Sequence, residues 1–227
     1  MDQFRVVQLR NSISNQIASG YLVRKDLILT SHHLFHAPDN TTCNVRFLED
    51  VDKSKRVGWN ENGCELVWFS TEQDIALLKL TCDLPIWVTN KVQDLSVPRF
   101  GKFKTQEIAG KNMGIGFVNY KDNSGINCSK ELPLFGTMRR SIQVDEIELH
   151  LDQSLTPSTP TDWQGISGTA FFANGYLVGV TKKTDEFLGE KVLCAIPISR
   201  VYENTDFCQH VFAGEDKPLL SCVTEEL

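Results

Sequence analysis

The chain has 227 residues, of which 41% are hydrophobic and 23% are charged, and it carries a net charge of -6 with an isoelectric point near 5.4. This length allows one large or two small domains with a real core, and the composition excludes a disordered chain. The acidic balance and the lack of a long apolar stretch argue against nucleic acid and the membrane as partners, because phosphate contacts need a concentrated basic surface and a spanning helix needs about 20 apolar residues.

Short runs rich in Val, Ile, Leu, Phe and Thr recur along the chain between Gly, Asn and Asp residues, whereas helix-period patterns are scarce. This pattern predicts an all-β fold. In chain order, we expect strands near residues 4–9, 16–23, 27–30, 43–48, 64–69, 75–80, 106–109, 112–118, 134–142, 145–151, 169–173, 176–181 and 191–197. These strands are too many for one open sheet. We expect them to close into barrels or to pack as sandwiches, because both arrangements leave few exposed strand edges.

The segment from Val88 to Lys104 interrupts the strand pattern with polar, Pro and Gly residues, and we expect it to join two β units with a cleft between them. The predicted domains are an N-terminal unit, a second unit and a C-terminal helix with a polar tail, over residues 1–95, 96–198 and 199–227.

Three further segments are expected outside the strands. Residues 153–164 form a long strand-free stretch, which suits a loop that lines a substrate site. A helix is expected between Ser199 and Val211, with Ser199 as its N-cap. The polar residues beyond Gly214 are expected to form a mobile tail.

The seven cysteines are an odd number without any C-x-x-C pair, and most lie within apolar runs. Buried, reduced thiols are therefore preferred over disulfide bonds or zinc ligands. The first residues also lack the basic segment, apolar core and cleavage site of a secretory signal. Both observations predict a cytoplasmic protein.

Three polar side chains stand beside predicted strands in the order His, Asp, Ser. His33 follows one apolar strand, Asp74 precedes another, and Ser167 lies in the run Gly165-Ile166-Ser167-Gly168. A serine hydroxyl needs a neighbouring imidazole to take its proton, and the imidazole needs a third group to fix its tautomer. In this scheme Ser167 is the nucleophile, His33 the base and then the acid, and Asp74 the orienting group. The backbone N–H groups of Gly165 and Ser167 would receive the oxyanion.

Five segments, in their order along the chain, resemble motifs of the trypsin-like serine proteases of the chymotrypsin fold. Their residue patterns are most similar to those of the HtrA-like bacterial branch. They are Ser19–Val23 with Leu27–His33, Asp74–Leu80, Ile108–Phe117, Gly165–Ala170, and Gly175–Val180 with Ala195–Ile198. The resemblance covers about residues 16 to 200, and the spacings of 41 positions from His33 to Asp74 and 93 from Asp74 to Ser167 are typical of that family. It implies an all-β fold of two antiparallel β-barrels, a Ser-His-Asp endopeptidase mechanism, and no cofactor or metal.

The sequence departs from the family's pattern in two places. Ile166 stands before the nucleophile, where zymogen-activated members have an aspartate that pairs with a newly cut N-terminus. Leu34 stands where a cysteine usually follows the histidine, which agrees with a reducing compartment. Because Ile166 has no carboxylate, activation by a salt bridge to a new N-terminus is excluded. The turn around Ser167 must therefore be either preformed or set by a partner.

Only one of the two adjacent histidines can face the nucleophile. Alignment of the strand end favours His33, which leaves His32 as a packing or surface residue. A metal site made by His32, His33 and His36 is the weaker alternative, because no carboxylate or thiolate lies at a convincing ligand spacing nearby.

The substrate pocket is less clear. In the family, the position six before the nucleophile forms the floor of the pocket for the residue preceding the scissile bond, and here that position is Thr161. Asp162 falls where a pocket wall would be and would receive a basic side chain, or it only caps a loop. Thr181 and Lys182 follow the strand that would pair with the substrate backbone. If Lys182 points inward, it would favour an acidic substrate residue, so the preference stays open.

These observations lead to three hypotheses. The first is an intracellular serine endopeptidase that cleaves an extended protein or peptide substrate without a cofactor, under the control of a regulatory protein partner. Trypsin-like modules of bacterial immune and conflict systems, which act in antiviral defence, are similar to this profile. The second is a catalytically silent, protease-like module that holds a peptide in the same cleft. The third is a metal-dependent hydrolase that uses the histidine cluster, which predicts inhibition by chelators.

Overall fold

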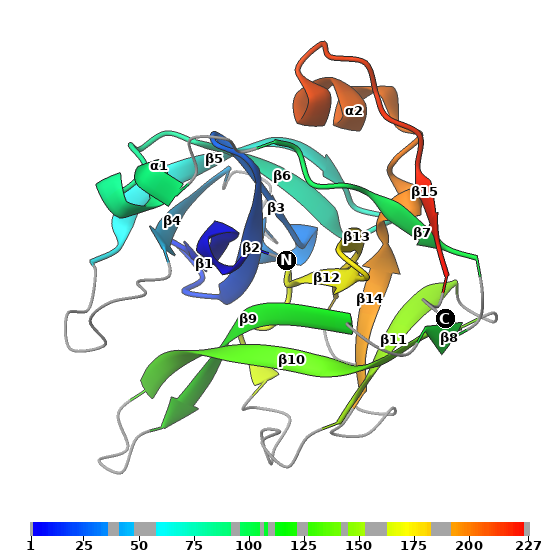
Figure 1. Cartoon of the computed structure of the whole chain (residues 1–227). Helices are drawn as coiled ribbons and strands as arrows, with labels where there is room; N and C mark the ends of the chain where they lie inside the picture. Colours follow the sequence, from blue (N-terminus) through cyan, green and yellow to red (C-terminus); the bar gives the residue numbers. More distant parts are fainter. Residues whose placement is uncertain are drawn as a thin grey trace.

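The fold is seen in a computed structural model (Figure 1). It describes residues 2–35, 41–47, 58–91, 96–104, 107–108, 112–121, 127–141, 145–152, 163–182 and 192–224. None of the helices in these ranges has the length and apolar character needed to cross a bilayer.

Six antiparallel strands of the N-terminal half close into a barrel in the order β1-β2-β3-β6-β5-β4. Their bounds are Val6–Asn11 (β1), Ile17–Arg24 (β2), Leu27–Thr30 (β3), Thr42–Phe47 (β4), Asn60–Ser70 (β5) and Ile75–Leu80 (β6). Strands β2, β3 and β6 are almost continuously apolar because both of their faces are buried. Alternate side chains of such a strand point to opposite faces, so Leu22 and Ile28 fill the barrel while Tyr21 and Leu29 pack outside it.

A second set of strands forms the other barrel, in the order β11-β14-β13-β12-β9-β10, and pairing of β10 with β11 closes it. The short strand β8 adds to the edge of β10. The bounds are Glu107–Ile108 (β8), Asn112–Lys121 (β9), Asn127–Ser141 (β10), Glu146–Leu151 (β11), Ala170–Ala173 (β12), Tyr176–Thr181 (β13) and Val192–Pro197 (β14). The long β9–β10 hairpin crosses the lower part of Figure 1. The prediction of an all-β protein built from two antiparallel barrels is confirmed.

Buried apolar side chains form three clusters. One lies within each barrel, and the third lies between the barrels and under the C-terminal helix. In β12, Phe171 belongs to the second barrel's interior, whereas the next residue, Phe172, packs in the shared cluster, where its ring lies 5.1 Å from that of Tyr21 in β2. The two barrels are therefore joined by a continuous apolar contact that fixes their relative position.

The elements outside the barrels connect and cover them. Two short 3-10 helices, η1 (Gln3–Arg5) and η2 (His32–Phe35), belong to the first half. The link between the barrels contains α1 (Ile86–Lys91) and β7 (Gly101–Phe103). After the second barrel come η5 (Ile198–Arg200), α2 (Thr205–Phe212) and β15 (Ser221–Val223).

The C-terminal helix is present, but two details differ from the expectation. Asn204 rather than Ser199 is the N-cap of α2, since its Oδ1 accepts a hydrogen bond from the Phe207 N–H at 2.9 Å. Ser199 lies instead in the separate turn η5. The expected mobile tail contains β15, which pairs in parallel with β7 of the link (Figure 1). The domain boundaries 1–95, 96–198 and 199–227 stay a prediction.

Candidate active site

His33 and Asp74 meet at the end of the first barrel. His33 lies in η2, directly after β3, and Asp74 ends the turn between β5 and β6. The His33 Nδ1 atom lies 2.7 Å from Asp74 Oδ2, and the His33 backbone N–H donates to Asp74 Oδ1, also at 2.7 Å. An ionised carboxylate only accepts hydrogen bonds, so Nδ1 carries the proton of this pair. The Nε2 atom of a neutral His33 ring is then left as a proton acceptor.

The backbone around Asp74 fixes this contact from both sides. Asp74 has a left-handed φ of 48°, a conformation that Asp tolerates better than most residues. Its N–H donates to the Thr71 carbonyl at 3.3 Å, and its carbonyl accepts the His32 N–H at 3.2 Å. Each side chain of the His33–Asp74 pair is 24% exposed, so the pair is shielded from bulk water yet reachable.

The neighbouring histidine points elsewhere. The His32 ring stacks on the Phe69 ring with their centroids 4.5 Å apart and their planes at 8°. The sequence left His32 as a packing or surface residue, and the stacking agrees with the packing alternative. His36 lies outside the described residues, and the described ranges contain no group of three or more His, Cys, Asp or Glu residues suited to a metal ion.

Ser167 lies in two consecutive four-residue turns that precede β12. The Ile166 N–H donates to the Trp163 carbonyl at 3.1 Å, and the Thr169 N–H donates to the Ile166 carbonyl at 3.1 Å. Gly165 (φ 99°) and Gly168 (φ 84°) occupy the third positions of these turns. A positive φ at the third position, after a residue of negative φ, is the signature of a type II turn, which favours glycine. The two glycines are therefore required by the geometry of the turns.

Most peptide groups of this double turn are already hydrogen-bonded. The Gly168 N–H donates to the Thr181 carbonyl at 2.8 Å, and the Ile166 carbonyl also accepts from the Thr169 Oγ1 hydroxyl at 2.6 Å. Among the residues that the structure describes, the N–H groups of Gly165 and Ser167 donate to no acceptor. These are the two donors that the sequence assigned to an oxyanion, and the geometry leaves both of them available.

The double turn rests directly on the first barrel. Ser19 of β2 donates its backbone N–H to the Ser167 carbonyl at 2.7 Å. A Cβ atom added to Gly168 would collide with the Ser19 carbonyl and with Thr30 Oγ1, and would lie 3.1 Å from the Ser31 nitrogen. Thr30 and Ser31 directly precede the two histidines, so the turn that carries Ser167 lies against the segment that leads to His33.

A polar network joins the two barrels beside Asp74. Arg200 of η5 donates to Gln73 Oε1 at 3.1 Å and to the Asp145 carbonyl at 2.9 Å. Burial opposes the ionisation of Asp145, but hydrogen bonds and charge from Arg140 and Arg200 outweigh it, so the pKa of Asp145 lies below its usual value. The residue before Asp74 is thus tied to the β10–β11 hairpin of the second barrel.

The remaining predicted site residues have different positions. Thr161 and Asp162 lie outside the described residues. Thr181 is fully buried, and its hydroxyl donates to the Thr169 carbonyl at 3.1 Å. The Lys182 ammonium donates to Glu146 Oε1 at 2.7 Å, which neutralises its charge. Whether Thr181 or Lys182 lines a substrate pocket stays a prediction. Trp163, two positions before Gly165, is buried in the core of the second barrel.

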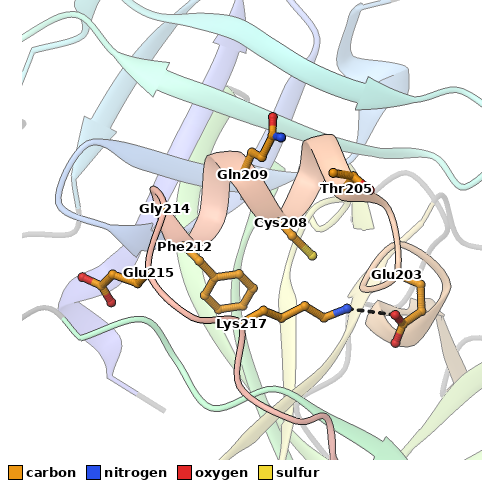
Figure 2. A pocket seen from close by; sticks show the side chains of 8 residues that line it. All are labelled: Glu203, Thr205, Cys208, Gln209, Phe212, Gly214, Glu215 and Lys217. Carbon is orange, nitrogen blue, oxygen red and sulfur yellow. Dashed lines mark hydrogen bonds and ion pairs between the residues drawn. The ribbon is translucent and has the colours of Figure 1, made fainter.

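A separate pocket of about 390 Å³ lies beside α2 (Figure 2). Lys217 crosses it and pairs with Glu203 at 2.9 Å, so its charge is already compensated. The Cys208 thiol donates to the Tyr202 carbonyl at 3.0 Å, and burial raises its pKa, which disfavours the reactive thiolate. None of the candidate catalytic residues lines this pocket.

Comparison with solved structures finds proteins of the same fold. The serine endoprotease from Yersinia pestis matches 93% of this chain with a TM-score of 0.53 and 19% sequence identity. Human heparin binding protein matches 96% of the chain with a TM-score of 0.55 and 12% sequence identity. An inactivated protease paralogue from the scabies mite matches 95% of the chain with a TM-score of 0.56 and 14% sequence identity. The chain has the chymotrypsin fold. The expected resemblance to trypsin-like serine proteases is thus confirmed at the level of the fold.

The coverage of these proteins differs. This chain spans 64% of the Yersinia chain, compared with 95% of the human and 98% of the mite chain. No protein-family model matches the sequence, and no curated protein matches it. Chains of the chymotrypsin fold include both a named endoprotease and a named inactivated paralogue, so activity has to be argued from the residues of the site.

Proposed function

We propose that the chain is a serine endopeptidase that cleaves a protein or peptide substrate through an acyl-enzyme intermediate. The observation that carries the proposal is the contact between His33 and Asp74. The bond at Nδ1 fixes the imidazole in the tautomer that a general base requires, and the bond from the His33 backbone N–H holds the carboxylate in place. The unused N–H groups of Gly165 and Ser167 supply the second element of the chemistry.

In the proposed mechanism, the Ser167 hydroxyl attacks the scissile carbonyl while His33 Nε2 takes its proton. Asp74 accepts the Nδ1–H and stabilises the resulting imidazolium. The N–H groups of Gly165 and Ser167 bind the oxyanion, and each such donor contributes roughly 3–4 kcal/mol of transition-state stabilisation. His33 then returns the proton to the leaving amine, and a water molecule activated by the same imidazole hydrolyses the acyl-enzyme.

A fluorophosphonate probe tests this proposal, because it reacts covalently with an activated serine. We expect the protein to be labelled, and labelling to be lost in Ser167→Ala and in His33→Ala. His32→Gln is the matched control, and it is expected to label like the wild type. The His32 ring stacks on Phe69, and the substitution keeps the backbone N–H that donates to the Asp74 carbonyl. Equal labelling of Ser167→Ala would refute the proposal.

A catalytically silent peptide-binding module is the second candidate, favoured by the fold's similarity to an inactivated mite paralogue. It predicts that a folded wild-type protein binds an extended peptide but reacts with no fluorophosphonate. A chelator such as EDTA separates the third hypothesis, since a metal-dependent hydrolase would lose activity and would tolerate Ser167→Ala.

The cytoplasmic location, control by a protein partner and a role in antiviral defence belong to the proposal as well. The described cysteines form no disulfide bond, and a reducing compartment would keep their thiols reduced. Purification of a tagged protein from its source, followed by identification of bound proteins and by cell fractionation, tests the partner and the location together.

A further inference from the structure

The turn that carries Ser167 lacks the support that zymogen-activated proteases use. Ile166 stands where the family's activating aspartate would be, and its side chain is buried in the second barrel's core at 1% exposure. The double turn nevertheless has its N–H groups at Gly165 and Ser167 available. Some other group must therefore hold the turn in this form.

Every polar atom of Ser19 in β2 forms a hydrogen bond, with the turn, with β9 or with β3. Its hydroxyl donates to the Gly165 carbonyl at 2.7 Å and accepts the Phe117 N–H of β9 at 2.8 Å. Its backbone N–H binds the Ser167 carbonyl at 2.7 Å, and its carbonyl accepts the Thr30 hydroxyl at 2.7 Å. The side chain is fully buried, so water does not compete for these bonds.

The effect on the oxyanion donors follows from peptide planarity. The peptide after Gly165 is held by the Ser19 hydroxyl at its carbonyl and by the Trp163 carbonyl at its N–H. The peptide after Ser167 is held by the Ser19 N–H and by the Thr181 carbonyl. A type I and a type II turn differ by a flip of the central peptide, which here contains the Gly165 N–H. Fixing the peptide that follows it opposes that flip.

We propose that Ser19 is a positioning residue that holds the nucleophile turn in its oxyanion-binding form from the first barrel. This inference rests on the proposed function. It implies that the turn is preformed without cleavage of the chain, and that a regulatory partner would act elsewhere than on this turn.

The test compares Ser19→Ala with Asn44→Ala, both measured with a fluorophosphonate. Asn44 is also a buried hydrogen-bonding side chain of the first barrel, 5% exposed, whose Oδ1 accepts the Asn62 N–H at 2.9 Å away from the site. We expect Ser19→Ala to lower the maximal inactivation rate constant about 100-fold, the effect of losing one oxyanion donor, with the probe's binding constant unchanged. Asn44→Ala is expected to keep both constants while losing thermal stability.

Hydrogen exchange provides a readout that does not depend on activity. In Ser19→Ala, the amides of residues 163–169 and of Phe117 are expected to exchange faster, whereas Asn44→Ala accelerates Asn62 instead. If Ser19→Ala does not fold, Ser19→Cys keeps a weak donor and acceptor at the same place and is expected to give an intermediate rate constant.

The outcomes separate the two proposals. In one outcome, the wild-type protein is labelled only at Ser167, and Ser19→Ala or Ser19→Cys is labelled at the wild-type rate. This result overturns the positioning role of Ser19 but leaves the protease proposal valid. A wild-type protein that never labels refutes the protease proposal, and the exchange data then decide whether Ser19 holds the turn: unchanged exchange at residues 163–169 overturns it.

Discussion

The two barrels contribute to the candidate site in different ways. In the first barrel, His33 and Asp74 bind each other directly through two hydrogen bonds of 2.7 Å, and the backbone on both sides belongs to the same barrel. In the second barrel, Ser167 lies on a turn whose carbonyl groups bind Ser19 of the first. The base and its orienting acid are therefore positioned locally, whereas the nucleophile is positioned by contact between the barrels. Disturbing this contact should affect the nucleophile before it affects the base.

The largest expected effect comes from breaking the local pair in the first barrel. Asp74→Asn keeps a residue that tolerates the left-handed φ of 48°, but its amide cannot accept both the Nδ1–H and the backbone N–H of His33. We expect kcat to fall about 10⁴-fold, which is the effect of an Asp-to-Asn change in a Ser-His-Asp catalytic triad. The melting temperature is expected to stay nearly unchanged. Wild-type turnover by Asp74→Asn would show that Asp74 does not orient and stabilise the His33 ring during the reaction.

The second prediction addresses the contact between the barrels. Gly168→Ala places a Cβ against the Ser19 carbonyl and Thr30 Oγ1 at a φ of 84°, and we expect a loss of about 4 kcal/mol or more in unfolding free energy. Gly214→Ala is the matched control, because Gly214 also has a positive φ, 87°, but no atom within 4 Å of the added Cβ. It should cost only about 1–2 kcal/mol. Denaturant unfolding checks both values, and equal losses would contradict the close contact.

A smaller effect is expected at the polar link between the barrels. Because the pKa of Asp145 is lowered in the folded protein, its ionised form stabilises the fold above its usual pKa of 3.8, and that contribution is lost as the pH falls through the lowered value. Asp145→Asn should therefore cost about 0.5 kcal/mol at neutral pH, since the carboxylate is 45% exposed and well screened. The difference from wild type should vanish in acid. A difference that grows with acidity would contradict this assignment.

The smallest expected difference concerns how the two barrels open. The Cys43 and Cys64 thiols lie 3.0 Å apart inside the first barrel, and their hydrogen bond together with burial raises the pKa of Cys64. Cys194 is buried in the second barrel. Because a shared apolar cluster joins the barrels, we expect all three thiols to resist iodoacetamide equally, while the exposed Cys222 reacts first. Mass spectrometry of timed samples measures this, and much faster alkylation of Cys194 would show that the second barrel opens alone.

Much of the fold could be predicted because its strands are short, apolar and separated by turn residues. Strands β3, β6 and β13 have the bounds that the pattern predicted, at 27–30, 75–80 and 176–181. The first half of β10 was missed, since Pro133 interrupts it and a proline within a run argues against a strand. Strands β7 and β15 were missed as well, because each has only three residues and their pairing joins segments far apart in the sequence.

The candidate site could be predicted only in part. The His33–Asp74 contact was anticipated from motif order, and the structure has it at hydrogen-bonding distance. In the sequence, Ser19 is only part of an apolar strand motif. Its side-chain partners lie 98 and 146 positions away, at Phe117 and Gly165, so no local pattern reveals them. A serine that faces inward among apolar neighbours was the one available signal, since a buried hydroxyl requires hydrogen-bond partners.

The pairing of β15 with β7 gives the C-terminal segment a mechanical connection to the middle of the chain. Just before β7, Phe100 forms a bridge to Leu177 of β13, so this link is attached both to the second barrel and to the last strand. Tension applied beyond Val223 would therefore be transmitted first to the span that joins the two barrels, before it loaded the hydrogen bonds of either barrel.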